Sequence, residues 1–509
     1  MESPTAAEQA TPGSVSDKAT EEQGIQGQMR KRFNFTSLYY LFVTGTAGWE
    51  AIIASLYQVL VAGGPTVLVW GFVISAVAAC CIAFSLAEFA SIWPTAAGQY
   101  HWAVALAPPK WKITVGWYSS WILLTMNLLS SISAIFAGAF SLQALIMISI
   151  DGYSAERWQT YLIFIAIISI SLCVNVFIPR ALHYLSLVGT AVHVLGFFTL
   201  IVTLLATTKE KNSAKVVFGT VTDYTGYNSA GVAFMVGMLP MASGFTTMDL
   251  PARYSEETAK PHTDVSRAMF WGVLTSSVIG LVLVLVIAFC MGDPSALLES
   301  EIASLSPLAE IVYASTGSLG AAIVFGSVIV VVAVLSAIDC MGSIARIIMA
   351  QARDQGLPFS QTLSKIHLRW NTPVNATILA ASIQAAISAI YIGNSTAFYG
   401  ILSGVITLQV MSFGLPIAFH LFRKKSLALK YGPWSLGRWG WLINAIGLLL
   451  YLFSFVAVSL PTSIPVTAQN MNYSAPIVGI VLLLATGLYL AWGRPTEAET
   501  VSDKKDIAS

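Results

Sequence analysis

Long apolar stretches separated by short polar segments run along most of this chain. A helix that crosses the hydrocarbon core of a bilayer needs about 20 consecutive, mostly apolar residues. The pattern predicts twelve such helices, at residues 38–62, 66–90, 114–148, 159–178, 184–206, 230–250, 267–291, 320–344, 374–392, 396–421, 440–460 and 475–493. The third stretch is long enough for a tilted helix with an interfacial turn. The sequence therefore predicts an all-α integral membrane protein with twelve transmembrane helices.

Both ends of the chain are polar. The N-terminal segment is rich in Glu, Ser, Thr and Gly, a composition typical of disordered chain. The cluster Arg30-Lys31-Arg32 leads directly into the first apolar stretch, so we expect no signal peptide. We therefore divide the chain into a disordered tail at 1–32, a twelve-helix domain at 33–493 and a C-terminal tail at 494–509.

Charged residues are scarce and unevenly placed. Only 10% of the 509 residues are charged and 56% are hydrophobic, whereas soluble domains carry about 25% charged residues. This composition excludes an ordinary cytosolic enzyme and a nucleic-acid-binding chain. If the twelve helices alternate in direction, 22 of the 26 Lys and Arg residues fall on the side that holds both chain ends. Because cytoplasmic loops are enriched in Lys and Arg, we expect both termini in the cytoplasm.

Two kinds of modifiable side chain can be placed on this topology. Candidate glycosylation sites at Asn394 and Asn472 fall on the outer side, within a few residues of the membrane. The cysteines lie in apolar stretches, which favours small buried hydrophobes over a disulfide framework or a metal site. They are Cys80, Cys81, Cys173, Cys290 and Cys340.

Sequence motifs of catalysis are missing. The chain has no Gly-Lys dipeptide and hence no phosphate-binding P-loop. It has neither an H-E-x-x-H nor a G-x-S-x-G motif. We therefore predict a protein that is not an enzyme and that has no cofactor and no metal.

Helix-breaking residues interrupt two of the predicted helices at matched positions. The first helix contains Thr44-Gly45-Thr46-Ala47-Gly48-Trp49-Glu50, and the sixth contains Pro240-Met241-Ala242-Ser243-Gly244-Phe245-Thr246. Unwound backbone inside a bilayer frees N–H and C=O groups that a polar substrate can satisfy. Two such breaks, each in the first helix of a five-helix half, are typical of an inverted-repeat transporter. The alternative is that these glycines only allow close helix packing.

Several segments carry a resemblance to a known family. They are Ala62-Gly63-Gly64-Pro65, Ser85-Leu86-Ala87-Glu88, 94–102, 226–231, Ser255-Glu256-Glu257, 352–360, 371–376 and 465–473, with Ala97-Gly98 in place of a usual pair of glycines. In their order and spacing the chain resembles the fungal amino acid/choline permeases of the amino acid–polyamine–organocation superfamily, close to choline and GABA permeases. The resemblance implies a five-plus-five inverted repeat, at 38–206 and 230–421, with two extra C-terminal helices at 440–493. It also implies a small cationic or zwitterionic amine substrate, moved with a proton.

We expect the substrate site at the two breaks. Its candidate residues are Gly45, Thr46, Ala47, Gly48, Trp49, Glu50, Ser243, Gly244 and Phe245. A carboxylate near the membrane midplane costs several kcal/mol unless it is paired, hydrated or protonated. We therefore interpret Glu50 as a counter-ion for an amine or as a proton-coupling carboxyl, and a purely structural hydrogen bond is the alternative. Because the family does not usually place an acid here, Glu50 is expected to influence substrate preference. Trp49 and Phe245 could offer aromatic faces to an ammonium group.

Further ionisable residues are candidates for coupling or gating. They are Glu88, His193, Asp249, Asp339 and Arg346. Asp249 precedes Arg253 by four residues, a spacing that suits an intrahelical ion pair. Glu88 could close an inner gate with Arg346 or Arg353, or could only cap a helix. An imidazole such as that of His193 can transfer protons near neutral pH, although a neutral buried histidine is the commoner case.

The sequence thus favours a proton-coupled permease for a small amine, working by alternating access. The expected partners are the substrate and the lipid bilayer, without nucleic acid, and the expected location is the plasma membrane or the vacuolar membrane. One alternative is a permease that serves a specialised biosynthetic pathway. Another is a nutrient receptor that binds the amine without transporting it.

Overall fold

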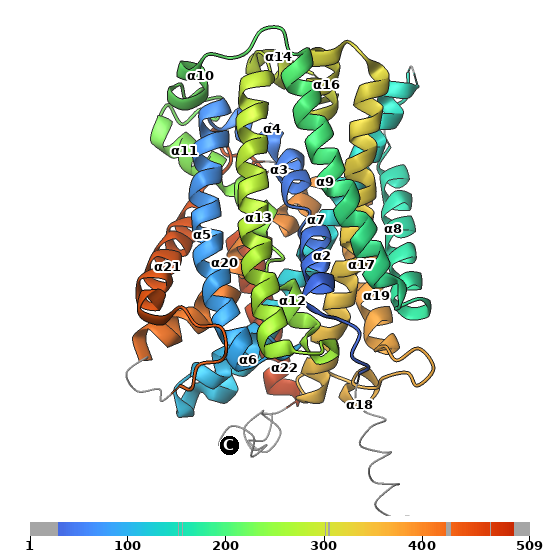
Figure 1. The fold of residues 1–509 in the computed structure, drawn as a ribbon, viewed down its shortest axis with the longest axis vertical. Coiled ribbons are helices and arrows are strands. Elements are labelled where there is room, and N and C mark those ends of the chain that lie inside the picture. Colours follow the sequence, from blue (N-terminus) through green and yellow to red (C-terminus); the bar gives the residue numbers. More distant parts are fainter. Residues whose placement is uncertain are drawn as a thin grey trace, which may run out of the picture.

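The computed structural model describes residues 29–492, apart from 151, 155, 301, 304–305, 424–428 and 469. The regular structure of these residues is helical, and the long helices run side by side along one axis of the molecule (Figure 1). Eleven helices in the described part are long and apolar enough to cross a membrane. They are Gly64–Ile92 (α5), Pro109–Ser149 (η1 and α7), Arg157–Phe177 (α8), Ala181–Thr207 (α9), Ala230–Arg253 (α11, η2 and α12), Pro261–Cys290 (α13), Leu319–Arg353 (α17), Val374–Gly393 (α19), Ser395–Arg423 (α20), Gly437–Ala457 (η5 and α21) and Ser474–Ala491 (in α22). The protein is therefore a multi-pass membrane protein.

The remaining predicted helix, the first, is divided into three pieces. They are α2 (Phe35–Thr46), α3 (Gly48–Ala54) and α4 (Leu56–Val61). None of the three reaches the 18 residues required of a single spanning helix. The difference between the twelve predicted helices and the eleven observed ones thus arises at the segment in which the sequence placed a break.

The sixth predicted helix is also irregular. It consists of α11 (Ala230–Met238), the 3₁₀ segment η2 (Leu239–Phe245) and the short α12 (Leu250–Arg253). Proline stands at the second position of η2 and again near the start of α12. Because proline has no backbone N–H and clashes with the preceding turn, a regular α-helix cannot continue through this segment.

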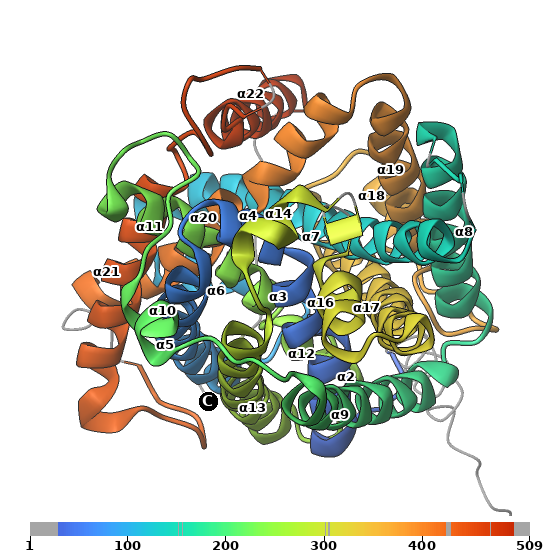
Figure 2. The same cartoon turned by 90° about the horizontal axis from the view of Figure 1, so that it is seen from above.

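The broken segments lie inside the bundle. Seen from above, α3 and α12 lie among longer helices and α2 lies between α13 and α9, whereas α8, α21 and α22 lie at the periphery (Figure 2). Trp49 of α3 is 1% exposed, whereas Leu483 of α22 is 73% exposed. An apolar side chain on the outer surface of such a bundle faces lipid, so α22 contributes little to the interior.

Two sequence expectations need correction. The third predicted helix contains no interfacial turn within 114–148, because α7 runs unbroken over Lys112–Ser149. Cys173 is exposed and Cys80 and Cys81 are half-buried, so only Cys290 and Cys340 are the buried hydrophobes that the sequence predicted. Cys173 lies on the peripheral α8, where an apolar position faces lipid. All five cysteines are free, and no group of three metal-ligating side chains occurs among the residues that the structure describes.

The predicted tails lie largely outside the described residues. Only 29–32 of the segment 1–32 is described, and 494–509 is not. The backbone N–H of Arg32 donates to the carbonyl of Glu257 at 2.7 Å. That of Arg30 donates to the side chain of Asn371 at 3.1 Å. The chain therefore enters α2 along the loops that follow α12 and α18 (Ser360–Leu363).

Candidate functional site

The first break is centred on Ala47. Its backbone adopts a left-handed conformation (φ 45°), which ends α2 and lets α3 start at Gly48. The carbonyl of Gly45 accepts hydrogen bonds from Ser336 Oγ of α17 at 2.8 Å and from Thr247 Oγ1 at 3.2 Å. Side-chain hydroxyls from two other segments thus satisfy a carbonyl next to the break, as backbone polar groups in lipid require.

The second break lies directly against the first. The Oγ atoms of Ser243 and Ser55 are 3.1 Å apart, and Ser243 Oγ donates to the carbonyl of Ala51 at 3.3 Å. A Cβ atom at Gly244 would lie 2.9 Å from the carbonyl oxygen of Gly48. Only glycine therefore fits at Gly244 without a shift of one backbone. The structure brings the two predicted breaks together at one place in the bundle.

A carboxyl–imidazole pair lies beside the first break. His193 Nδ1 of α9 is 2.9 Å from Glu50 Oε1 and 3.0 Å from Oε2. Both side chains are 3% exposed. Trp49 Nε1 donates to the carbonyl of His193 at 3.2 Å, and the two rings lie 5.8 Å apart. The sequence identified both residues separately as candidates, but their contact across 143 positions had no signal in the sequence.

Asp339 is a second buried acid near the same break. It is 1% exposed on α17, and Ser186 Oγ of α9 lies 3.3 Å from each of its carboxyl oxygens. Tyr254 Oη donates to its backbone carbonyl at 3.1 Å. Ser186 and His193 are two turns apart on α9, so this helix contacts both buried acids.

The expected ion pair between Asp249 and Arg253 is present, and both side chains are buried. Arg253 also donates to the carbonyls of Ala96 and Ala97, at 3.2 and 3.0 Å. A Cβ at Gly98 would meet the Arg253 guanidinium, and Gly98 has a positive φ of 53°. The end of the sixth segment is therefore anchored on the loop before α6 (Gln99–Leu106).

Glu88, which the sequence left open as a gate residue or a helix cap, bonds the segment before α21. Glu88 accepts from Ser435 Oγ at 3.0 Å and from the backbone N–H of Leu436 at 2.9 Å. Arg346 pairs with Glu257 at 2.5 Å, and Arg353 pairs with Glu256 at 2.6 Å. The reason is that η3 (Ser255–Glu257), directly after α12, brings two acids against the end of α17.

The N-terminal segment closes over this cluster. The N–H of Phe33 donates to the carbonyl of Glu257 at 3.0 Å, and the N–H of Ala259 donates to the carbonyl of Phe33 at 3.0 Å. The guanidinium of Arg346 lies 3.9 Å from the ring centre of Tyr254. Charge pairs, a cation–π contact and backbone hydrogen bonds therefore join the segment after α12 to the end of α17 and to the N-terminal segment.

One contact at this end was not predicted. Tyr100 Oη of α6 donates to Asp354 Oδ2 at 2.9 Å, just after the end of α17. Burial raises the pKa of Asp354 to about 6, against the opposing effects of the Tyr100 hydrogen bond and the Arg353 charge. Asp354 lies in the segment 352–360, whose resemblance to a family motif was the only signal in the sequence.

The side chain of each candidate glycosylation residue accepts a hydrogen bond from a nearby backbone N–H. Asn394 is exposed and its Oδ1 accepts from the N–H of Ala397 at 3.0 Å. Asn472 is half-buried and its Oδ1 accepts from the N–H of Ser474 at 2.8 Å. Their glycosylation stays a prediction.

Comparison with known proteins finds matches that cover most of this chain. The amino acid permease family model matches residues 33–483. A Macrophomina phaseolina protein whose name describes an amino acid/polyamine transporter is 32% identical over 84% of this chain and 94% of its own length. The choline transporter of Saccharomyces cerevisiae is 29% identical, over 88% of this chain and 79% of its own. Amino-acid permease 2 of Neurospora crassa is 27% identical, over 94% of this chain and 88% of its own.

Proposed function

Because the chain belongs to the amino acid permease family, we propose that it is a secondary transporter that moves a small amine, such as an amino acid, GABA or choline, across the membrane. The observation that carries this proposal is the contact between two broken helices next to a buried carboxyl–imidazole pair. Backbone dipoles at such breaks can bind the charged groups of a substrate that passes between them.

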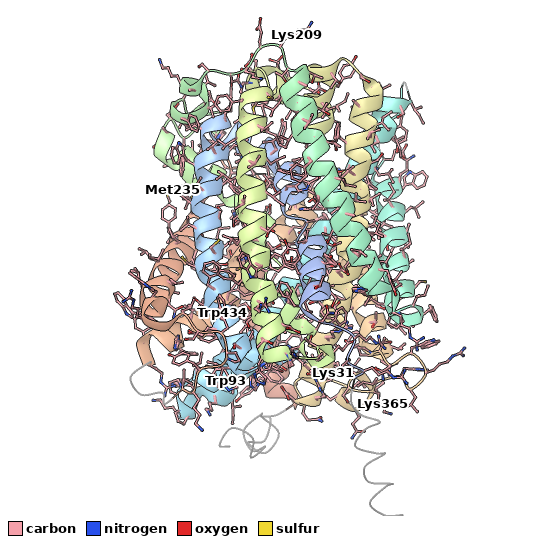
Figure 3. The ribbon with its side chains drawn as sticks, viewed as in Figure 1. Lys31, Trp93, Lys209, Met235, Lys365 and Trp434 are labelled. Atoms are coloured by element: carbon pink, nitrogen blue, oxygen red, sulfur yellow. The ribbon has the colours of Figure 1, made fainter. Side chains whose placement is uncertain are left out.

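The proposed topology has twelve spans, with α2, α3 and α4 together forming the first. The repeats at 38–206 and 230–421 are proposed to be inverted with respect to each other, with two extra helices at 440–493. The matched breaks near the start of each repeat support this arrangement. Lys31 and Lys365 lie at one end of the bundle and Lys209 at the other (Figure 3). The Lys-rich and Arg-rich end is proposed to be cytoplasmic, and the membrane to be the plasma membrane.

The proposed coupling site is the pair formed by Glu50 and His193. The pair carries a charge of −1 when the imidazole is neutral and 0 when it holds one additional proton. A proton taken up from one side and released on the other therefore changes the charge next to the substrate break. Each charge that crosses the membrane carries about 2.3 kcal/mol per 100 mV of potential, which can drive accumulation. Asp339, held by Ser186, is the second candidate for this role.

Alternating access requires the inner end to open. In the proposed cycle, release of the amine to the cytoplasm separates Arg346 from Glu257 and Arg353 from Glu256, and frees the segment around Phe33. These contacts join the region after α12 to α17 and to the N-terminal segment. The two broken segments would then move relative to α17.

The direct test is uptake of radiolabelled amines by a permease-deficient yeast that expresses this chain. The panel contains choline, GABA, proline, pipecolate and basic amino acids, each measured at several external pH values with and without a protonophore. The proposal expects accumulation of at least one amine that collapses with the protonophore. A protein that binds an amine without accumulating it would instead be a receptor. Accumulation of an unusual precursor alone would indicate a permease of a specialised pathway.

A further inference from the structure

On the side that faces away from the first break, α20 and α21 hold the second break through hydrogen bonds. Gln409, near the middle of α20, donates from Nε2 to the carbonyl of Phe245 at 3.3 Å. The same Nε2 donates to Tyr451 Oη of α21 at 3.2 Å. Gln409 is 3% exposed and Tyr451 is 7% exposed. Phe245 is the last residue of η2, so the geometry of the break depends on a side chain that lies 164 positions away.

Two buried polar groups next to this contact, in Gln409 and Tyr451, can each form a further hydrogen bond. Gln409 Oε1 has no hydrogen-bond partner among the described residues. The amide cannot be reversed to pair it, because the carbonyl of Phe245 requires a donor and Oε1 is an acceptor. Within the described part of the chain, the Tyr451 hydroxyl accepts its hydrogen bond from Gln409, so its own proton is available for another partner. A buried polar atom without a partner destabilises the folded state, because it has lost its hydrogen bonds to water.

A small cavity lies against these groups. Its lining includes Ser75 of α5, Ala242 and Phe245 of η2, Gln409 of α20, and Tyr451 and Ser454 of α21. Its volume is about 20 Å³, whereas a cavity needs about 10–15 Å³ to hold one water molecule. A buried water molecule also needs two to four polar partners. Among the residues that the structure describes, Ser75 Oγ makes one long bond of 3.5 Å, to the carbonyl of Met238, so its lone pairs can accept a further hydrogen bond.

We propose that this cavity binds one water molecule, and that Gln409, Tyr451 and this water position the second break. The water donates to Gln409 Oε1 and to Ser75 Oγ, and it accepts from Tyr451 Oη. Ser243 and Gly244 face the first break, so the water lies on the opposite side of η2 from the substrate region. The consequence is that α21, one of the two helices outside the proposed repeats, acts on the substrate site through the backbone of Phe245. This effect on transport rests on the proposed function, whereas the water site itself does not.

Radiolytic labelling in ¹⁸O-enriched water tests the water site without any substrate. A buried aromatic ring is oxidised rapidly only if a water molecule lies next to it. We expect labelling of Tyr451 well above that of Phe413, which is fully buried on α20, the helix of Gln409, and does not line the cavity. The labelling should fall to the level of Phe413 in Gln409→Leu. Equal labelling of Tyr451 and Phe413 in the unmodified protein would overturn the proposal.

Transport kinetics test the positioning role. Tyr451→Phe and Gln409→Leu should each raise the KM for the transported amine about three- to tenfold, the equivalent of one lost hydrogen bond, with normal delivery to the membrane. The double variant should be no worse than Gln409→Leu alone, since both changes remove the same network. Tyr118→Phe is the matched control, because the hydroxyl of Tyr118 bonds Thr486 of α22, away from the break. An unchanged KM in both variants would overturn the positioning role. Lack of transport by the unmodified protein would contradict the proposed function but leave the labelling result standing.

Discussion

Replacing Glu50 by glutamine separates the charge of this side chain from its packing. Glutamine has almost the same volume, and its Oε1 can still accept a hydrogen bond from an Nδ1–H of His193, which now lies 2.9 Å from Glu50. The expected loss of folding free energy is therefore small, about 1 kcal/mol, the net value of one hydrogen bond. Glu50→Ala also leaves His193 without its partner, and loss of one member of a buried pair costs about 3–5 kcal/mol. We expect Glu50→Gln to reach the membrane normally and Glu50→Ala to be delivered poorly.

Uptake measurements should separate loss of the Glu50 charge from loss of folding. The amide in Glu50→Gln cannot hold a coupling proton or a charge of −1, so uptake should be lost despite normal delivery. The assay is uptake of the transported amine between pH 5 and 7, normalised to protein at the cell surface. Glu299→Gln is the control, because Glu299 is exposed at the end of the short helix α14 (Pro294–Glu299). Uptake by Glu50→Gln with the rate and pH dependence of the unmodified protein would refute the assigned role of this carboxyl.

Other parts of the site give further expectations. Gly244→Ala should abolish transport in a folded protein, because a Cβ would lie 2.9 Å from the facing carbonyl. Gly479→Ala is the control and should transport normally, because a Cβ there meets nothing within 4 Å. Equal uptake by the two variants would contradict the close contact. Burial raises the pKa of Asp354 to about 6, above the ordinary value of about 3.9. The native state therefore loses stability as pH rises from about 4 through 6, and thermal melts of Asp354→Asn should lack this loss. Arg346→Gln removes the close partner of the buried Glu257 and leaves it only the longer contact with Arg32, at 3.9 Å. The expected cost is at most about 3–5 kcal/mol. This variant should increase hydrogen exchange in residues 29–34, and unchanged exchange would argue against a closed inner end.

Features that depend on local sequence could be predicted. Helix positions follow from the length of each apolar stretch, and the observed α5 and α19 begin and end within two residues of the predicted 66–90 and 374–392. The break at Ala47 follows from two nearby glycines. The ion pair of Asp249 with Arg253 follows from a spacing of one helical turn.

Contacts between distant segments could not be predicted. Apolar periodicity does not state which faces of two membrane helices meet, because nearly every position of each helix is apolar. The pairing of Glu50 with His193 and of Gln409 with Phe245 joins residues more than 100 positions apart. The sequence left open whether Glu88 pairs with Arg346 or Arg353 or only caps a helix. The turn at η3 brings Glu257 and Glu256 to these two arginines instead. A family resemblance fixes the order of helices without fixing these side-chain contacts.

The central claim is that a transported amine binds where the two broken helices meet. The most direct measurement is an electron cryomicroscopy map of the purified protein with a transported amine bound. The account predicts ligand density between Gly45–Gly48 and Ser243–Gly244, with unwound backbone on both sides and the side chains of Glu50 and His193 in contact. Unbroken helices at both segments, or an amine bound elsewhere in the bundle, would contradict the account.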